Sequence, residues 1–277
     1  MLKTRVLTAI ALLPVVLGML FLAGPSAWAA FAMAIALVSC WEWSRLCGFG
    51  RAAQATYLAA SVAIAAALAF ALLRGPAAVW ANLAQASFIA SAYFWLFAVP
   101  PWLALRLRPE PWACGLAGWF VAWPMWAALV VLREAGPWVL LAVAALVWVA
   151  DIAAYFAGRR FGRRKLAPAI SPGKTWEGVV GAILGVLAYG VALDIAAHAG
   201  PGPLTPHFEA GAGAPALAAM VALAALSVLG DLFESWMKRG AGRKDSSGLL
   251  PGHGGVLDRI DALTPTLPAA ALLLSLA

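Results

Sequence analysis

Acidic and basic side chains gather in one polar stretch near the end of an otherwise apolar chain. The stretch from Ser227 to Leu263 carries His253 among glycines and ten acids and bases: Asp231, Glu234, Asp245, Asp258, Asp261, Lys238, Arg239, Arg243, Lys244 and Arg259. Carboxylates that converge beside a basic surface can hold hard divalent cations, which take oxygen ligands and bridge phosphates. Such cations stabilise the charge on a phosphoryl group during in-line displacement. The alternative is an ion-pair network, which contributes little where solvent screens it.

The spacing places several of these side chains on shared helix faces. Asp231, Ser235 and Lys238 stand at i, i+4 and i+7, so on a helix they form one polar stripe. Asp258 and Asp261 share a face at i, i+3. The glycine-rich turn that separates the two groups lets the backbone approach a ligand closely. His253 in that turn could be a metal ligand, an acid or a phosphate contact.

A second polar group begins at Asp151. Asp151 and Tyr155 stand four residues apart and share a helix face, which makes them candidates for substrate binding. The alternative for Asp151 is an ordinary helix-end acid that pairs with a nearby arginine. Five bases follow between Arg159 and Lys165. A basic cluster of this kind is typical of a cytoplasmic loop and needs no further role.

The segment from Ser171 to Gly178 reads SPGKTWEG and precedes an apolar run. Free backbone N–H groups at a helix start favour an anion, and a lysine adds positive charge. We therefore predict that Lys174 binds phosphate, with Ser171 and Thr175 beside it. Glu177 could belong to the same site or could cap the helix as the acid of a capping box.

The composition defines where these groups must lie. Of 277 residues, 64% are hydrophobic and only 11% are charged, whereas soluble domains carry roughly a quarter charged residues. The chain is therefore predicted to be an integral membrane protein. Its net charge of +7 indicates basic loops that face anionic headgroups or substrates rather than nucleic acid.

Apolar segments predict about nine transmembrane helices, at 6–23, 27–44, 55–73, 84–105, 112–132, 137–157, 176–198, 214–234 and 261–276. The first is long for a signal peptide and is expected to remain as a helix. With the N-terminus inside, 17 of the 19 Lys and Arg residues fall in inside loops, and only Arg74 and Arg133 fall outside. The positive-inside rule therefore favours a cytoplasmic N-terminus. The fold class is all-α and polytopic, with N-terminal helices for the lipid groove and packing (1–135) and a catalytic region with a cytoplasmic-face polar site (136–277).

The polar stretch resembles the signature of the phosphatidate cytidylyltransferases, or CDP-diacylglycerol synthases. The matching positions are Ser235, Lys238-Arg239, Lys244-Asp245, Pro251-Gly252-His253-Gly254-Gly255, Asp258-Arg259 and Asp261. Asp151 with Tyr155, and the segment from Ile170 to Gly178, also resemble this family. The resemblance is specific over about 150–265, and before that it is a general apolar character.

The resemblance implies an enzyme that joins CTP to phosphatidic acid, giving CDP-diacylglycerol and pyrophosphate. It also implies a metal pair at Asp231 and Asp258, with Mg²⁺ as the usual ion, and Ser235, Lys238 and Asp261 in the same site. Arg239, Lys244 and Lys174 are expected to bind phosphate groups. The expected assembly is a homodimer in a bacterial inner membrane, with the site facing the cytoplasm. The alternative functions are those of a transferase acting on an isoprenoid lipid and of an ion-coupled transporter.

Overall fold

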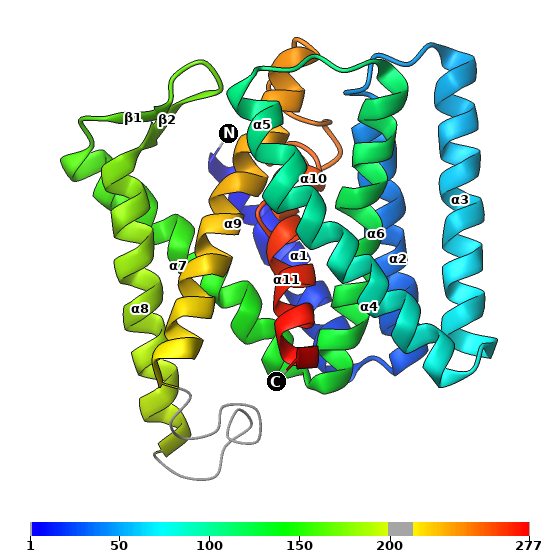
Figure 1. The fold of residues 1–277 in the computed structure, drawn as a ribbon, viewed down its shortest axis with the longest axis horizontal. Coiled ribbons are helices and arrows are strands. Elements are labelled where there is room, and N and C mark those ends of the chain that lie inside the picture. Colours follow the sequence, from blue (N-terminus) through cyan, green and yellow to red (C-terminus); the bar gives the residue numbers. More distant parts are fainter. Residues whose placement is uncertain (1, 199–212, 277) are drawn as a thin grey trace.

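The computed structural model describes residues 2–198 and 213–276 and is built mainly from helices (Figure 1). The elements are α1 (Leu2–Leu22), α2 (Pro25–Ser44), α3 (Arg51–Arg74), α4 (Ala77–Tyr93), η1 (Phe94–Ala98), α5 (Val99–Ala104), α6 (Pro111–Ala135), α7 (Pro137–Phe161), β1 (Lys165–Ala167), β2 (Ser171–Thr175), α8 (Trp176–His198), α9 (Gly213–Gly240), α10 (Leu257–Ile260) and α11 (Leu263–Leu276). Each of the nine apolar segments predicted from the sequence coincides with a helix in this described part. Seven helices are long and apolar enough to cross a membrane, and two apolar helices, Val6–Leu22 and Leu263–Leu276, are shorter.

The helix from Ala77 to Ala104 is continuous but irregular. A π-helical turn, η1, occupies its middle and is followed by α5, which contains Pro100 and Pro101. A proline inside a helix lacks the N–H group for the helical hydrogen bond and crowds the preceding turn. The π-helical turn lies just before this proline pair.

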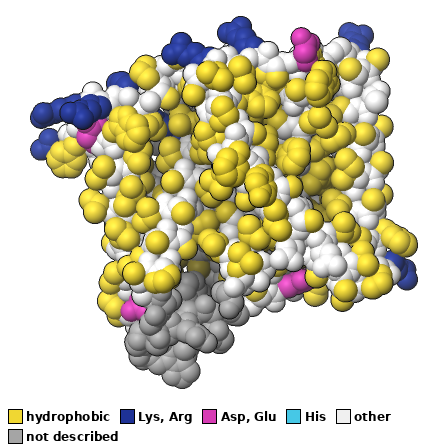
Figure 2. All heavy atoms as spheres, in the orientation of Figure 1, with side chains coloured by type: hydrophobic (Ala, Val, Ile, Leu, Met, Phe, Trp, Pro, Cys, Tyr) yellow, Lys and Arg dark blue, Asp and Glu magenta, His cyan; other side chains and the backbone are white. Residues whose placement is uncertain are grey.

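Basic side chains gather at one end of the helices. Figure 2 shows Lys and Arg along the upper edge of the visible face, with hydrophobic side chains covering the helices below them. The ends of α2, α7 and α9 and the hairpin β1–β2 lie at this upper end in Figure 1. The side chains of Lys3 and Arg5 lie outside the described part. The positions of Lys and Arg in the predicted loops indicate that this edge faces the cytoplasm.

Helix α6 forms the centre of the packing, against α2, α4 and α11. Its Trp126, Met125 and Ala128 side chains are fully buried. Near the charged end, Phe233 of α9 is buried among aromatic rings of other elements, namely Trp43, Phe94, Trp95 and Trp102. This aromatic contact fixes α9 against α2, and the two helices together carry the polar residues described below.

The segment before α8 was expected to be a loop, but it forms a two-stranded antiparallel hairpin, β1–β2. Lys165 pairs with Thr175, and Ala167 pairs with Ser171. The hairpin leads into α8, whose first turn is capped by Thr175: its Oγ1 accepts a hydrogen bond from the Gly178 N–H at 3.1 Å. Thr175 is thus the N-cap residue of α8.

Candidate active site

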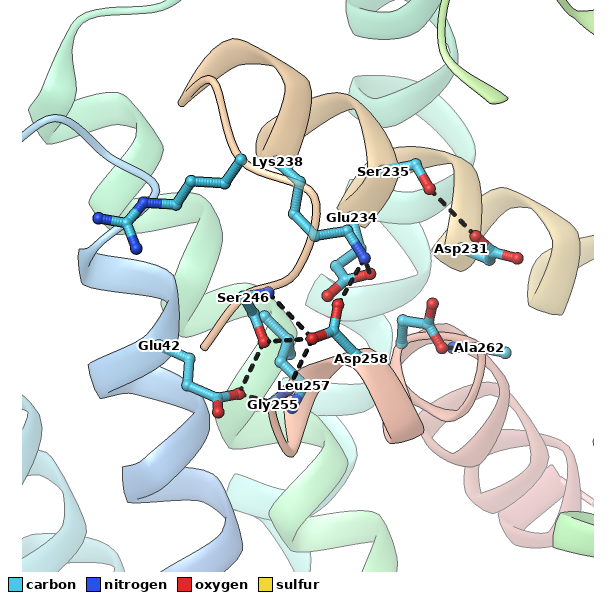
Figure 3. A network of polar contacts seen from close by, with 12 residues as sticks. Glu42, Asp231, Glu234, Ser235, Lys238, Ser246, Gly255, Leu257, Asp258 and Ala262 are labelled. Carbon is cyan, nitrogen blue, oxygen red and sulfur yellow. Dashed lines mark hydrogen bonds and ion pairs between the residues drawn. The ribbon is translucent and has the colours of Figure 1, made fainter. Parts of the chain in front are cut away.

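Helix α9 carries the predicted stripe of polar side chains toward α10 (Figure 3). The Ser235 hydroxyl donates a hydrogen bond to Asp231 Oδ1 at 3.2 Å. One turn further, the Lys238 ammonium contacts two acids, Glu234 and Asp258, the latter at 2.6 Å. Lys238 and Glu234 are both buried. The stripe predicted from spacing therefore exists, and Glu234 belongs to it.

Asp258, at the start of α10, joins the stripe to the loop between α9 and α10, residues 241–256, which carries most of the signature positions. Its Oδ1 accepts from Lys238, and its Oδ2 accepts from the Ser246 N–H at 2.9 Å, the Ser246 hydroxyl at 3.0 Å and the Gly255 N–H at 2.7 Å. Burial alone would raise the pKa of Asp258, but the hydrogen bonds from Lys238, Gly255 and Ser246 hold that pKa below its ordinary value. Asp258 therefore remains ionised and fixes both Lys238 and the loop.

A second acid, Glu42 of α2, organises the same loop from the opposite side. Its side chain is completely buried. Its two oxygens accept hydrogen bonds from the Ser246 and Ser247 hydroxyls, at 3.1 and 2.5 Å, and from the backbone N–H groups of Val256 and Leu257, at 2.9 and 2.6 Å. The last two are free donors at the start of α10. Ser246 bridges Glu42 to Asp258, so Glu42 orients Asp258 through one intervening side chain (Figure 3).

Sequence reasoning missed Glu42, although a signal for it was present. An ionisable residue inside an apolar helix is a functional candidate by default because its desolvation is costly. Glu42 stands between Trp41 and Trp43 in such a helix.

Two glycines allow the loop to close around these acids. Gly254 adopts a φ of +86°, a conformation that side chains with a Cβ rarely take. A Cβ at Gly255 would overlap Ser246 Oγ and Glu42 Oε1. The glycines predicted to permit close approach to a ligand therefore serve, in this structure, to let backbone N–H groups reach carboxylates.

The upstream polar group meets α9 through Lys174. Its ammonium lies 2.7 Å from Asp231 Oδ2 and 3.5 Å from the Val228 carbonyl oxygen. Asp151 of α7 lies within electrostatic range of both Asp231 and Lys174. The structure thus brings Asp151, Lys174 and Asp231 to one place, although they lie up to 80 positions apart in the sequence.

Asp261 lies within electrostatic range of both Lys174 and Lys238. Its Oδ1 accepts a hydrogen bond from the Ala262 N–H at 2.8 Å. Burial, and next the nearby charge of Asp231, raise the pKa of Asp261 to about 7, against an ordinary value of 3.8. Its carboxyl group is therefore one that a cation would stabilise in the ionised form.

Other residues predicted for the site lie elsewhere. The Tyr155 side chain is exposed and its hydroxyl accepts a hydrogen bond from Arg159 at 2.9 Å. Glu177 accepts hydrogen bonds from the backbone N–H groups of Arg163 and Arg164, at 3.0 and 3.2 Å, and so anchors the segment before β1. It stands at the second position of α8, one short of the acid of a capping box.

Four further residues predicted to contact the substrates lie at the rim. Arg239 is exposed and donates to the Arg243 carbonyl oxygen at 3.2 Å, and Lys244 is exposed as well. Ser171 lies at the start of β2, paired with Ala167. His253 has a buried Nδ1 with no hydrogen-bond partner within the described part of the chain. In the described structure none of these residues hydrogen-bonds to the four acids that form the α9–α10 cluster, namely Asp231, Glu234, Asp258 and Asp261.

The charges of the cluster fit a divalent cation. Asp231, Glu234, Asp258 and Asp261 face two ammonium groups, so the cluster carries an excess of two negative charges when all four acids are ionised. Over residues 2–198 and 213–276, no three His, Cys, Asp or Glu side chains form a metal-binding group by themselves. Mg²⁺ is usually held by one or two carboxylates plus substrate phosphates rather than by an all-protein cage. The donor set fits that mode of binding.

The family model described as the cytidylyltransferase family matches residues 3–277. The chain belongs to this family. It is 40% identical over 286 residues to the phosphatidate cytidylyltransferase of Pseudomonas aeruginosa, covering 99% of this chain and 97% of that protein. It is 38% identical over 301 residues to that of Haemophilus influenzae, covering 97% and 96%, and 37% identical over 275 residues to that of Brucella suis, covering 98% and 92%. The resemblance inferred from the signature is therefore confirmed along nearly the whole chain.

Proposed function

We propose that this cytidylyltransferase-family protein transfers the cytidylyl group of CTP to phosphatidate and releases pyrophosphate. The observation that carries the proposal is the 40% identity to a phosphatidate cytidylyltransferase across 99% of the chain. The acid and lysine cluster of α9 and α10 supplies the groups that such a reaction needs. A phosphate oxygen of the lipid attacks the α-phosphorus of CTP, a new P–O bond forms, and the bond to the β-phosphate breaks.

The site contributes positioning and charge neutralisation. A phosphate monoester is already nucleophilic near neutral pH, so no strong general base is required. Lys238, held between Glu234 and Asp258, presents a fixed positive charge. Lys174 presents a second from the hairpin, and we assign Arg239, Lys244 and His253 to phosphate contacts at the rim.

We propose that Asp231 and Asp258, with Asp261 beside them, hold Mg²⁺ as one or two cations. Each of the two expected ligands pairs with a lysine, Lys174 on Asp231 and Lys238 on Asp258, at 2.7 and 2.6 Å. A bound cation would neutralise the nucleotide's phosphates and stabilise the charge that develops during displacement. Asp261, with its raised pKa, adds an oxygen donor that binding of a cation would ionise.

An apolar cavity of about 200 Å³ lies between α8 and α9, lined by Trp176, Ile183 and Val228 among others. Val228 is also the residue whose carbonyl oxygen Lys174 approaches. We place the hydrocarbon part of the lipid in this cavity, with its phosphate beside Lys174 and Asp151. Residues 136–277 then carry both substrate sites, while residues 1–135 contribute packing and Glu42.

The distribution of bases supports the membrane placement that we propose. We propose nine crossings, a cytoplasmic N-terminus and a site that opens to the cytoplasm of a bacterial inner membrane. The seven long helices and the two shorter apolar helices of the described chain allow this count. We also propose a homodimer, and light scattering on the purified protein tests that assembly.

Incorporation of radiolabelled CTP into lipid by the purified protein tests the activity. We expect label in lipid with phosphatidate as acceptor, none with an isoprenoid phosphate, loss of activity in chelator and recovery with Mg²⁺. Glu110→Gln, at an exposed acid before α6, serves as the control for substitution of an acid. Label in the isoprenoid product alone would contradict the proposed acceptor. Unchanged activity in chelator would contradict the role of the cation.

A further inference from the structure

A second cavity, of about 270 Å³, lies on the side of α9 away from the acid and lysine cluster. It is formed where the end of α2, the segment between α5 and α6, and the end of α9 meet. On an α-helix with 3.6 residues per turn, Trp236 and Gly240 point about 140° and 180° away from Asp231. Both line this cavity. The cavity therefore lies on a different face of α9 from the one that carries Asp231.

Three arginines from three separate elements line the cavity: Arg45 after α2, Arg108 before α6 and Arg243 after α9. The described part of the chain shows no ion pair between any of them and a carboxylate. Arg45 stacks over the Trp41 ring with its guanidinium carbon 4.9 Å from the centroid, a contact that leaves its charge uncompensated. Three arginine side chains that line one concavity place positive charge around it, and an anion bound among them reduces their mutual repulsion.

Hydrogen bonds and buried side chains hold the wall of the cavity in place. The Trp236 indole N–H donates to the Leu107 carbonyl oxygen at 3.1 Å, which ties α9 to the segment that carries Arg108. Below it, Cys47 and Cys114 are buried and close the floor. The Trp43 indole N–H donates to the Cys114 carbonyl oxygen at 2.7 Å and fixes that floor to α2. The three arginines therefore project from restrained backbone.

From this geometry we propose that the cavity is a second anion-binding site that takes a phosphate group, distinct from the site of cytidylyl transfer. Guanidinium groups match phosphate oxygens with paired hydrogen bonds. At about 270 Å³ the cavity falls just below the range of roughly 300–1,000 Å³ that holds drug-sized ligands. It therefore suits a phosphate-sized or pyrophosphate-sized group rather than a whole nucleotide. At the edge of a membrane, such a group comes either from an anionic phospholipid headgroup or from free solution.

Two binding measurements on the full chain distinguish these sources. The first is calorimetric titration of pyrophosphate into protein in neutral detergent, with chelator present so that a cation at the acid cluster does not contribute. The second is native mass spectrometry of retained phosphatidylglycerol against phosphatidylcholine. The test variant is Arg108→Gln, because Arg108 is exposed and its replacement should not disturb folding. The matched control is Arg51→Gln, at an exposed arginine of the same end that does not line the cavity.

We expect Arg108→Gln to weaken binding of at least one probe by tenfold or more and Arg51→Gln to leave it within about twofold, tenfold being about 1.4 kcal/mol. Loss of pyrophosphate binding identifies a free anion as the ligand, and loss of phosphatidylglycerol alone identifies a headgroup. The proposal is overturned if neither probe binds wild type more tightly than Arg108→Gln. It is equally overturned if Arg51→Gln weakens binding as much, because the attraction would then be diffuse surface charge.

Discussion

Replacement of Glu42 by Gln should impair the enzyme although Glu42 contacts neither Lys174 nor Lys238 in the described structure. Glu42 accepts four hydrogen bonds, two from hydroxyls and two from backbone N–H groups. The hydroxyls can turn to other acceptors, but the backbone N–H groups of Val256 and Leu257 cannot. Glu42→Gln keeps the shape but places an amide NH₂ where one of the two acceptor oxygens stood, so one of these N–H groups loses its partner.

An unpaired buried donor costs about 1–3 kcal/mol, and each 1.4 kcal/mol is a factor of ten. Because the loop must hold its conformation for Asp258 to meet Lys238, we expect turnover to fall by roughly 5- to 140-fold. Glu42→Ala removes both acceptors and leaves two backbone donors unpaired, so the free energy of unfolding should fall by about 2–6 kcal/mol.

The assay compares transfer of label from CTP to phosphatidate with thermal unfolding of the same preparations. Glu110→Gln is the matched control, because Glu110 is exposed and makes no side-chain hydrogen bond at the start of α6. Glu42→Gln should reduce turnover with only a modest fall in Tm, whereas Glu42→Ala should reduce both. Wild-type turnover and Tm in Glu42→Gln would refute the reasoning, since the loop would then hold Asp258 without this acceptor.

Two further substitutions test the same loop. Asp258→Asn should abolish turnover and also lower the Tm, because the amide cannot pair with Lys238 as the carboxylate does and leaves a buried donor without its acceptor; near wild-type rates would remove Asp258 from the site. Gly255→Ala should destabilise the protein by about 1–3 kcal/mol through overpacking, since its Cβ would meet Ser246 and Glu42. Gly248→Ala, where a Cβ meets nothing within 4 Å, is the control, and equal Tm values for the two variants would contradict the packing argument.

Much of the fold was predictable because most of the helices are long apolar runs. Burial in lipid demands that a spanning segment satisfy its own backbone groups, so hydropathy alone locates helices. The hairpin β1–β2 was missed for a physical reason: strands of three and five residues in a basic segment rich in Gly and Pro show no alternation of polar and apolar residues. The hairpin is anchored by hydrogen bonds from the backbone N–H groups of Arg163 and Arg164 to Glu177, and not by an apolar face.

The candidate site was predictable where helical spacing decides the geometry. Asp231, Ser235 and Lys238 share a face because α9 continues without interruption to Gly240. Spacing could not reveal that Lys174 reaches Asp231, since that contact depends on how α8 and α9 pack. Nor could it reveal Glu42, whose donors lie more than 200 positions away along the chain.

Binding of Mn²⁺, as a spectroscopic stand-in for Mg²⁺, tests most directly whether the α9–α10 acids hold a cation. Binding is followed by electron paramagnetic resonance in the presence of a non-hydrolysable CTP analogue, for wild type, Asp231→Asn, Asp261→Asn and Glu177→Gln. Glu177 is the control because its oxygens bind backbone N–H groups outside the cluster. We predict that the two aspartate variants weaken Mn²⁺ binding by at least about tenfold, or 1.4 kcal/mol, while Glu177→Gln matches wild type. Wild-type Mn²⁺ affinity in Asp231→Asn and Asp261→Asn would contradict the account.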